Sequence, residues 1–259
     1  MNQNTRLLAS LALCSSFSAT AANWSDTQFH FNSGDVKNPF SQQSAQTQIY
    51  SVQHASGYDY GDNFFFIDFT KDDLDDGFNN NDFYGEWYSS FLMPKAWQPS
   101  ASSAMQSASF VAGINVSGDA KVIKYLPGVK LNWKASGFDF LSTTLTAYID
   151  DSEGVAKGGA PTQSDSWMFD VAWGMPFNIA KHKFYFTGHV EYIASREDEF
   201  GNDVKGWILA QPAVRWDIGH ALMGKEKQLM LGVEWQWWRN KLGTDITESS
   251  PQLHFVWHF

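Results

Sequence analysis

The feature that most constrains this chain is a two-residue period of apolar side chains that persists over most of its length. Around residues 129–133 and 167–173, Val, Leu, Trp and Phe occupy every second position, and mostly polar or small residues lie between them. The same alternation returns at 184–192 and 229–237. Because side chains of a β-strand point alternately to its two faces, each segment predicts a strand with one apolar and one polar face.

Composition favours a membrane barrel over a membrane helix. Hydrophobic residues make up 43% of the chain and aromatic residues 16%, yet the mean hydropathy is -0.34, so apolar and polar residues are interleaved. No run of about 18 apolar residues is present, the length at which a transmembrane helix becomes credible. A chain of polar average still spans a bilayer as a barrel, because only alternate side chains meet lipid. A soluble β-sandwich is the alternative, but it would bury its apolar faces between two sheets, whereas aromatic residues near the segment ends fit lipid-facing girdles.

About twelve segments carry the alternation, an even number of the kind a closed bacterial barrel needs. The sequence therefore predicts an all-β fold, a closed antiparallel transmembrane β-barrel of about 12 strands. The first segment has the weakest pattern, and a ten-stranded barrel is the alternative. The segments centre on residues 24–33, 46–56, 62–71, 82–92, 105–117, 122–135, 137–150, 164–175, 182–195, 204–217, 227–240 and 249–259.

The connections between these segments differ in length. Short connections are expected at residues 57–61, 136–137 and 176–181. Mostly longer, polar connections are expected at residues 72–81, 151–163, 196–203 and 241–248. If both chain ends are periplasmic, the longer set is extracellular, as in outer-membrane barrels. The long connection at 93–104 is an exception, and Pro212 removes a ladder donor from the segment that contains it.

Residues 1–21 have the pattern of a cleaved secretion signal. Arg6 supplies the positive start, residues 7–17 form a short apolar run, and Ala19-Thr20-Ala21 provides a small-x-small cleavage site. We expect the mature barrel to comprise residues 22–259. An ordinary N-terminal helix is the alternative.

Loss of this signal segment would fix the cysteine content and the charge of the mature protein. The single cysteine, Cys14, lies inside the segment, so disulfides, zinc-thiolate sites and a cysteine nucleophile are excluded from the mature chain. The formal charge is -10, and removal of Arg6 with no acidic residue makes it -11. So acidic a protein is not expected to bind nucleic acid.

The last segment carries a further local signal. Leu253, Phe255, Trp257 and the terminal Phe259 occupy alternate positions, with polar residues or valine between them. A final strand that ends in Phe with aromatics at alternate positions resembles the assembly signal of outer-membrane proteins. We therefore expect the barrel assembly machinery to insert this chain into the cell outer membrane of a Gram-negative bacterium, in contact with its lipid.

The polar face of the strands is expected to line the barrel interior and to contact a small solute. A barrel of about twelve strands is hard to fill with side chains and too narrow for a wide pore. Aromatic rings would stack on a planar solute while charged groups bind its polar edge; charge pairing within the lumen is the alternative role for each residue. The expected substrate-binding residues are Phe64, Phe66, Asp68, Glu86, Tyr88, Tyr148, Asp170, Tyr185, Arg215, Glu234 and Trp238. The same face is expected to carry Tyr50, His54, Lys130, Lys134, Asp150, His189, Glu191, Trp207, Asp217, His254 and His258.

Metal binding and catalysis are not expected. The run from Asp72 to Gly77 has the composition of a calcium loop, but Leu74 occupies a ligand position and Phe83 the position of the closing Glu, so a solvated acidic loop is favoured. Lipid-hydrolysing barrels place Ser and His on the lipid-facing side, whereas the predicted lumen histidines belong to no Ser/His motif. We therefore expect neither an enzyme nor a cofactor.

Two parts of the chain resemble a known family. Residues 48–69, together with Gln211-Pro212, residues 232–243 and residues 251–259, are similar to the Tsx-type nucleoside channel superfamily, in particular to its divergent members. The resemblance implies a twelve-stranded monomeric barrel that passes nucleosides through a narrow, aromatic-lined channel. Relatives also serve as phage and colicin receptors, so a surface receptor or structural protein without selective transport is the alternative function, and a lipid-modifying enzyme a more distant one.

Overall fold

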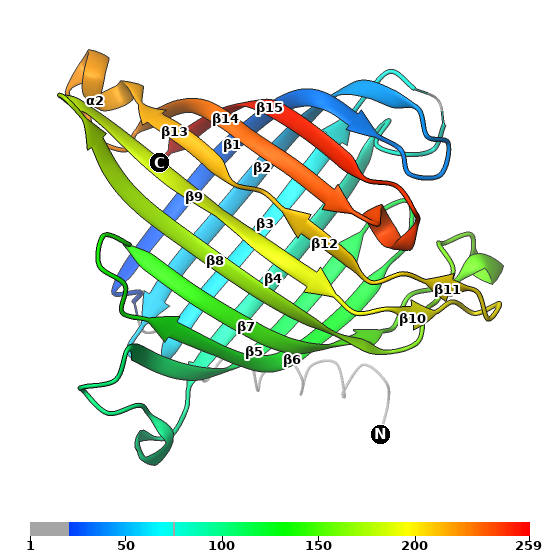
Figure 1. Cartoon of the computed structure of the whole chain (residues 1–259), viewed down its shortest axis with the longest axis horizontal. Helices are drawn as coiled ribbons and strands as arrows, with labels where there is room; N and C mark the ends of the chain where they lie inside the picture. The colour runs from blue at the N-terminus through cyan, green and yellow to red at the C-terminus, as the bar shows by residue number, and fades with distance from the viewer. Residues whose placement is uncertain (1–20, 75) are drawn as a thin grey trace, which may run out of the picture.

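The computed structural model describes residues 21–74 and 76–259, which form one closed antiparallel sheet and a small separate hairpin (Figure 1). Residues 1–20 of the expected secretion signal lie outside the described residues. Strands β1 to β9 each pair with their neighbours in the chain. The last strand, β15, pairs with both β14 and β1, and this pairing closes the barrel. The fold prediction is therefore confirmed.

The strands run close to their expected positions. They are β1 (Trp24–Lys37), β2 (Ser44–Tyr58), β3 (Gly61–Lys71), β4 (Asp82–Leu92), β5 (Met105–Ser117), β6 (Ile123–Trp133), β7 (Phe140–Asp150), β8 (Ser166–Ile179), β9 (His182–Ile193), β12 (Trp207–Ala210), β13 (Ala213–Asp217), β14 (Leu229–Arg239) and β15 (Glu248–His258). The hairpin outside the barrel is β10 (Arg196–Glu197) with β11 (Asp203–Val204).

β12 and β13 are two parts of one barrel strand, so the described chain contains twelve barrel strands rather than ten. Both pair with β9 and with β14 in one continuous register. The break falls at Gln211 and Pro212, where proline has no N–H to donate. The backbone stays attached there, because Gln211 N donates to His189 O at 3.0 Å and Trp235 N donates to Pro212 O at 2.8 Å.

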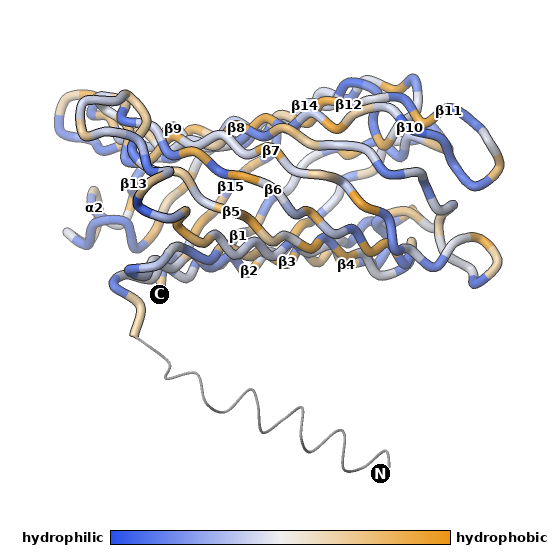
Figure 2. Tube along the Cα trace, turned by 90° about the horizontal axis from the view of Figure 1, so that it is seen from below, coloured by the Kyte–Doolittle hydropathy of each residue, from blue (hydrophilic) through white to orange (hydrophobic). Residues whose placement is uncertain are grey.

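The period of two sorts side chains between the outside and the inside of the barrel. In β3, Ile67 and Phe69 are 39% and 52% exposed on the outer face, while Phe66 and Asp68 line the interior. Apolar and polar positions follow one another along the strands in Figure 2. The outer face is therefore suited to lipid and the inner face to a polar lumen.

The weakest segment of the sequence pattern proves to be a complete strand. β1 pairs with β2 from Trp24 to Lys37 and with β15 from Gln28 to Ser33. The terminal residue continues the seam, because Phe259 N donates to Thr27 O at 3.0 Å. The closing strand therefore has its last backbone groups held by the first strand.

The two barrel ends differ. The end that carries the C-terminus and α2 (Ile218–Met223) is here called the terminal end, and the end that carries β10–β11 the loop end (Figure 1). The loop end also holds η2 (Val155–Lys157) and η3 (Lys241–Gly243). The long connection with η1 (Lys95–Trp97) lies at the terminal end as expected. A connection at residues 218–226 follows from the predicted segments, but its helix α2 was not predicted.

One expected turn is wrong. Residues 176–181 were predicted as a connection, but β8 continues to Ile179 and only Ala180 and Lys181 form the turn. Pro176 stays in register opposite Tyr185, and the Phe177 and Phe184 rings stack at 5.4 Å. Ala180 has a φ of 52°, the left-handed geometry that a two-residue hairpin turn requires.

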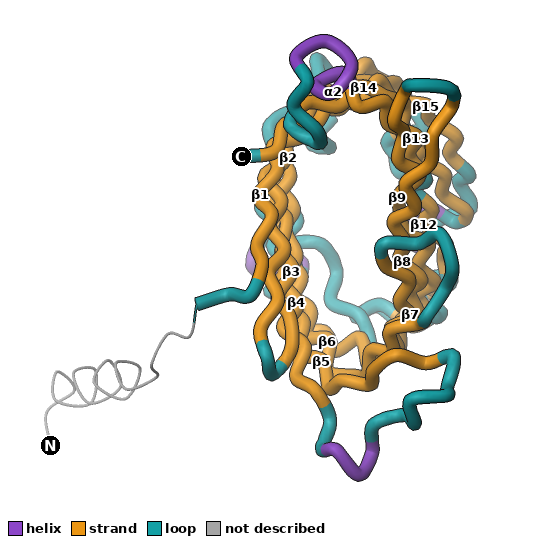
Figure 3. Tube along the Cα trace, turned by 90° about the vertical axis from the view of Figure 1, so that its left-hand side faces the viewer, coloured by secondary structure: helices purple, strands orange, loops and turns teal. Residues whose placement is uncertain are grey.

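No helix of the described residues is long and apolar enough to cross a bilayer. Viewed along its axis, the barrel is oval, with β1 to β4 along one long side and β7 to β9 along the other (Figure 3).

Candidate functional site

The barrel interior holds one cavity of about 2110 Å³ to which every barrel strand contributes. Its lining reaches Phe78 and Lys241 at the loop end and Lys227 and Phe259 at the terminal end. A cavity lined from end to end is the geometry of a passage rather than of a closed binding pocket.

Ten of the eleven predicted substrate-binding residues line this cavity: Phe64, Phe66, Asp68, Glu86, Tyr88, Tyr148, Asp170, Arg215, Glu234 and Trp238. Tyr185 has the inward parity of β9 but is not part of the lining. Its ring lies 5.0 Å from Lys227 Nζ near the terminal end. Contact of these side chains with a solute stays a prediction.

Two residues of the wider set point outward, contrary to the prediction. Ile49, Ser51 and Gln53 line the cavity, so Tyr50 and His54 lie on the opposite face of β2. Tyr50 contacts the Phe31 ring at 5.2 Å, and His54 stacks on Phe65 at 5.4 Å. The parity was misjudged because β2 mixes polar and apolar residues on both faces.

The other exceptions in the wider set are structural. Asp217 is fully buried and caps α2 by accepting from His220 N at 2.8 Å. Lys134 lies just beyond β6 and donates to Ala101 O at 2.8 Å. Asp150 forms an ion pair with Lys124 Nζ at 2.9 Å, with both side chains 4% exposed. These three groups are held by contacts within the protein.

Aromatic rings gather on the wall formed by β3 and β4. The Phe66 ring lies 6.1 Å from Phe64 and 6.0 Å from Tyr84. Tyr84 Oη donates to Glu86 Oε1 at 2.5 Å, and Asn115 Nδ2 donates to the same oxygen at 3.0 Å. The wall therefore places aromatic rings beside a carboxylate that its neighbours hold in one orientation.

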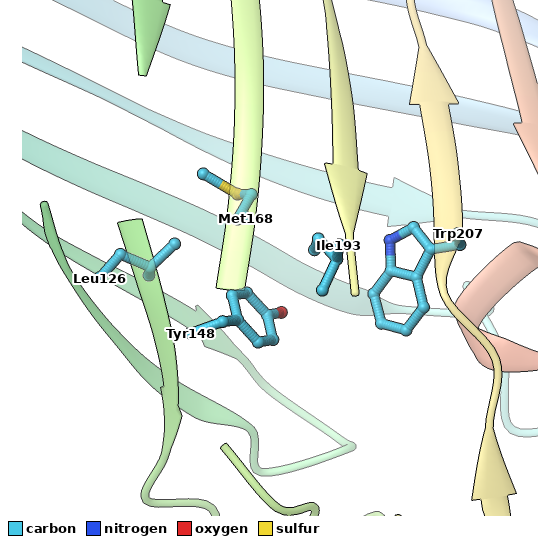
Figure 4. Packing of buried hydrophobic residues seen from close by; sticks show 5 residues of the cluster. All are labelled: Leu126, Tyr148, Met168, Ile193 and Trp207. Atoms are coloured by element: carbon cyan, nitrogen blue, oxygen red, sulfur yellow. The ribbon is translucent and has the colours of Figure 1, made fainter. Parts of the chain in front are cut away.

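A compact apolar cluster lies on the inner wall near the loop end. Its members are Leu126, Tyr148, Met168, Ile193 and Trp207, and they come from five different strands (Figure 4). The Arg196 guanidinium lies 4.2 Å from the Trp207 ring and 5.2 Å from the Tyr148 ring. This packing narrows the polar passage on one side, since apolar side chains occupy positions that face the lumen.

Carboxylates and a histidine face each other on β8 and β9. Asp170 Oδ1 lies 3.0 Å from His189 Nδ1, and His189 Nε2 lies 2.8 Å from Gln211 Oε1. Glu191 is directly opposite Asp170 in the β8–β9 ladder. Like charges in that position repel, so the pairing is not one that packing alone would favour.

A second polar network crosses the β1–β15 seam and was missed by the sequence analysis. His30 Nδ1 lies 3.1 Å from His254 Nε2, and His254 Nδ1 lies 3.3 Å from Glu234 Oε2. Asn32 Nδ2 donates to Glu234 Oε1 at 2.8 Å. The inward parity of His254 was predicted, but its partner lies 224 positions away and is identified only by the register of barrel closure.

The β14–β15 connection folds against the loop-end rim. Lys241 Nζ donates to Glu248 Oε2 at 2.8 Å and to Lys37 O at 2.7 Å, with both charged side chains 3% exposed. Burial lowers the pKa of the Lys241 ammonium, an effect that the Glu248 carboxylate opposes. Lys241, Leu242 and Thr244 line the cavity, so this connection forms part of the mouth.

The acidic 72–77 run does not show a cation site. Asp76 accepts hydrogen bonds from Asn38 Nδ2 at 2.8 Å and Ser41 Oγ at 2.9 Å, which join two loops. Asp75 lies outside the described residues. Within 21–74 and 76–259, no three acidic, His or Cys groups are arranged to hold a metal ion.

Neither a protein-family model nor a curated protein matches this sequence. Solved structures do match its fold. The NanC porin has a TM-score of 0.50 at 11% identity, over 90% of this chain and 99% of that one. The KdgM porin has a TM-score of 0.47 at 8% identity, over 91% and 99%. An outer membrane channel from Pseudomonas putida F1 has 0.48 at 8%, over 95% and 98%.

At 11% identity the NanC likeness concerns the fold alone, which is a closed antiparallel β-barrel. The lipid-suited exterior and the polar cavity describe the same class of protein. Membership of the Tsx-type superfamily stays a prediction.

Proposed function

We propose that this protein is an outer-membrane channel for passive, substrate-selective diffusion of small polar solutes, with nucleosides as the expected class. The observation that carries the proposal is the single cavity that runs between the two barrel ends with rings and charged groups on one wall. Nucleosides are proposed because of the sequence resemblance to the Tsx-type family. They also suit the lining, because a base has a planar face for stacking and a ribose has hydroxyls for hydrogen bonds.

The β3–β4 wall supports this solute class. Phe64, Phe66 and Tyr88 line the cavity, and so does the Glu86 carboxylate, which Tyr84 and Asn115 orient through Oε1. Stacking of a base on an aromatic side chain contributes roughly 1–3 kcal/mol in nucleic-acid sites. A carboxylate accepts from ribose hydroxyls. Such contacts stay weak one by one, as a channel needs if the solute is to leave again.

We also propose how the chain is processed, inserted and assembled. Residues 1–21 are removed, residues 22–259 are inserted into the outer membrane by the barrel assembly machinery, and the barrel works as a monomer without a cofactor. No catalytic role is proposed, because no described histidine forms a Ser–His pair with a carboxylate behind it.

Uptake into proteoliposomes tests the channel and its lining together. Initial uptake of uridine and adenosine at low concentration is compared with that of a sugar of similar size. We expect nucleosides to enter faster. Phe66→Ala and Tyr88→Ala, each removing one lumen ring, are expected to reduce that preference while the barrel stays folded.

Phe69→Ala is the matched control, because Phe69 lies on the same strand but faces outward. It should leave the preference unchanged. If the parent protein never favours nucleosides over the sugar, the selective channel is wrong and a general pore or a receptor is left. If the preference survives in both lumen variants, the channel stands and the assigned lining is wrong.

A surface receptor is the second candidate. Phe40 and Phe200 are 68% and 64% exposed on loops at the loop end, where an extracellular protein would meet them. Phage or colicin binding to cells that produce the Phe200→Ser variant tests this role. Unchanged binding would exclude that ring from the receptor surface.

A further inference from the structure

The charge of the cavity wall is strongly one-sided. Thirteen Asp and Glu residues line it, against six Lys and Arg residues. Four of those cations are paired with carboxylates: Lys124 with Asp150, Lys130 with Asp62, Lys227 with Asp139 and Lys241 with Glu248. The lumen therefore keeps a negative surplus that its own ion pairs do not cancel.

The surplus is densest where β4, β8 and β9 face the lumen. Glu86 Oε1 accepts hydrogen bonds from Tyr84 and Asn115, and Asp170 Oδ1 pairs with His189 Nδ1. Glu191 is 8% exposed and lines the cavity together with its neighbour Trp207. Glu191 lies directly opposite Asp170 in the β8–β9 ladder, and Glu86 lines the same cavity from β4.

These carboxylates do not form a chelating site. The described residues contain no group of three acidic or His side chains that could hold a metal ion. Spread-out carboxylates create a negative potential without a tight binding point. A cation is then attracted into the lumen and still able to leave, which is the condition for conduction.

We infer that the channel passes cations in preference to anions, and that Glu86, Asp170 and Glu191 set this preference. The inference rests on the proposed channel function and adds the charge class of solute that the lumen admits. Small cations and uncharged solutes with hydroxyl or amino donors are admitted, while carboxylates, phosphates and sulfates meet a negative wall.

Reversal potentials test the inference without any knowledge of the natural solute. The refolded full-length barrel is placed in a planar bilayer between KCl solutions of unequal concentration. The sign of the zero-current potential gives the permeability ratio of K⁺ to Cl⁻. We expect a ratio well above one in the parent protein.

Charge removal should lower that ratio in steps. Glu191→Gln and Glu86→Gln are each expected to reduce it about two-fold, the effect of a unit charge acting through water at about 8 Å with a Debye length of about 10 Å. Arg215→Gln removes a lumen cation and should raise the ratio. If the permeability ratio falls in the two Glu→Gln variants and rises in Arg215→Gln, the effect is electrostatic, because a general loss of structure would not shift the ratio in opposite directions.

Asp203→Asn is the matched control, since Asp203 is exposed on the β10–β11 hairpin and does not line the cavity. It should leave the ratio unchanged. A conducting barrel with a ratio of one or less, or with equal effects of Glu191→Gln and Asp203→Asn, overturns the inference alone. Absence of any conductance in folded barrels overturns the proposed channel as well.

Discussion

Replacing Lys241 by Met tests how firmly the β14–β15 connection is held at the loop end. The ammonium donates to Glu248 and to the Lys37 carbonyl, and it lies 5.9 Å from the Trp238 ring and 5.3 Å from the Phe78 ring. It therefore joins the connection to β1, β14, β15 and the β3–β4 loop at the rim. Met keeps most of the side-chain volume and removes the charge.

The expected loss of stability follows from what remains behind. Removing one partner of a buried ion pair costs about 3–5 kcal/mol, because the other charge stays buried. Glu248 would keep the Lys37 backbone N–H at 2.5 Å and the Gln236 amide at 2.7 Å, so we expect the lower end, about 3 kcal/mol. Adding Glu248→Gln removes the stranded charge and should recover most of the loss.

Lys205→Met is the matched control from the same region. Lys205 pairs with Asp245, but the two side chains are 42% and 82% exposed. A surface ion pair of this kind contributes about 0–1 kcal/mol. Comparing Lys241→Met with Lys205→Met therefore shows how much of the lost stability is due to burial of the ion pair rather than to the ion pair itself.

Urea unfolding of the refolded barrel in lipid vesicles, followed by tryptophan fluorescence, measures these free energies. Single-channel conductance of the same samples should rise in Lys241→Met, since Lys241 and Leu242 line the mouth and release of the connection widens it. If Lys241→Met lowers the free energy of unfolding by less than about 1 kcal/mol, no more than Lys205→Met does, the Lys241–Glu248 pair does not hold the β14–β15 connection in place.

Three further predictions concern assembly and the strand break. Deleting Phe259 removes the N–H bonded to Thr27 O and the terminal aromatic, so heat-modifiable barrel in outer-membrane fractions should fall; unchanged levels would contradict the assembly role. Gly188→Ala should destabilise the barrel by on the order of 1–3 kcal/mol, because Gly188 has a φ of +147° and an added Cβ would lie 2.3 Å from Gln211 O; an unchanged urea midpoint would refute this reasoning. Intact mass of the protein from outer membranes should show a mature chain that begins at Ala22, and an uncleaved Met1 would contradict the expected signal.

The fold could be predicted because one physical rule acts all along the chain. Lipid outside and water inside force every strand to alternate, so segments such as 82–92 and 105–117 were located with the bounds that β4 and β5 have. Pro176 was read as a turn signal, but proline is tolerated near the end of a strand. Sequence alone could not show that β8 continues past it.

The site was less predictable, because parity tells which face a residue is on and not what it touches. Where both faces of a strand are mixed, as around Tyr50, even the face was misjudged. His30 and His254 meet only because β1 pairs with β15 in one register. The alternation of apolar and polar residues along one strand contains no information on that register.

The contacts also divide the predicted lining into groups that neutralise each other and groups that remain open to a solute. Glu234 Oε1 accepts a hydrogen bond from Asn32, and Glu234 Oε2 lies 3.3 Å from the buried His254 ring. Glu191 lines the cavity directly opposite a second carboxylate, Asp170. Because barrel folds carry many different functions, selectivity has to come from groups of this second kind. In the proposed channel, the fold sets the width of the lumen, and the lumen carboxylates set which solutes cross it.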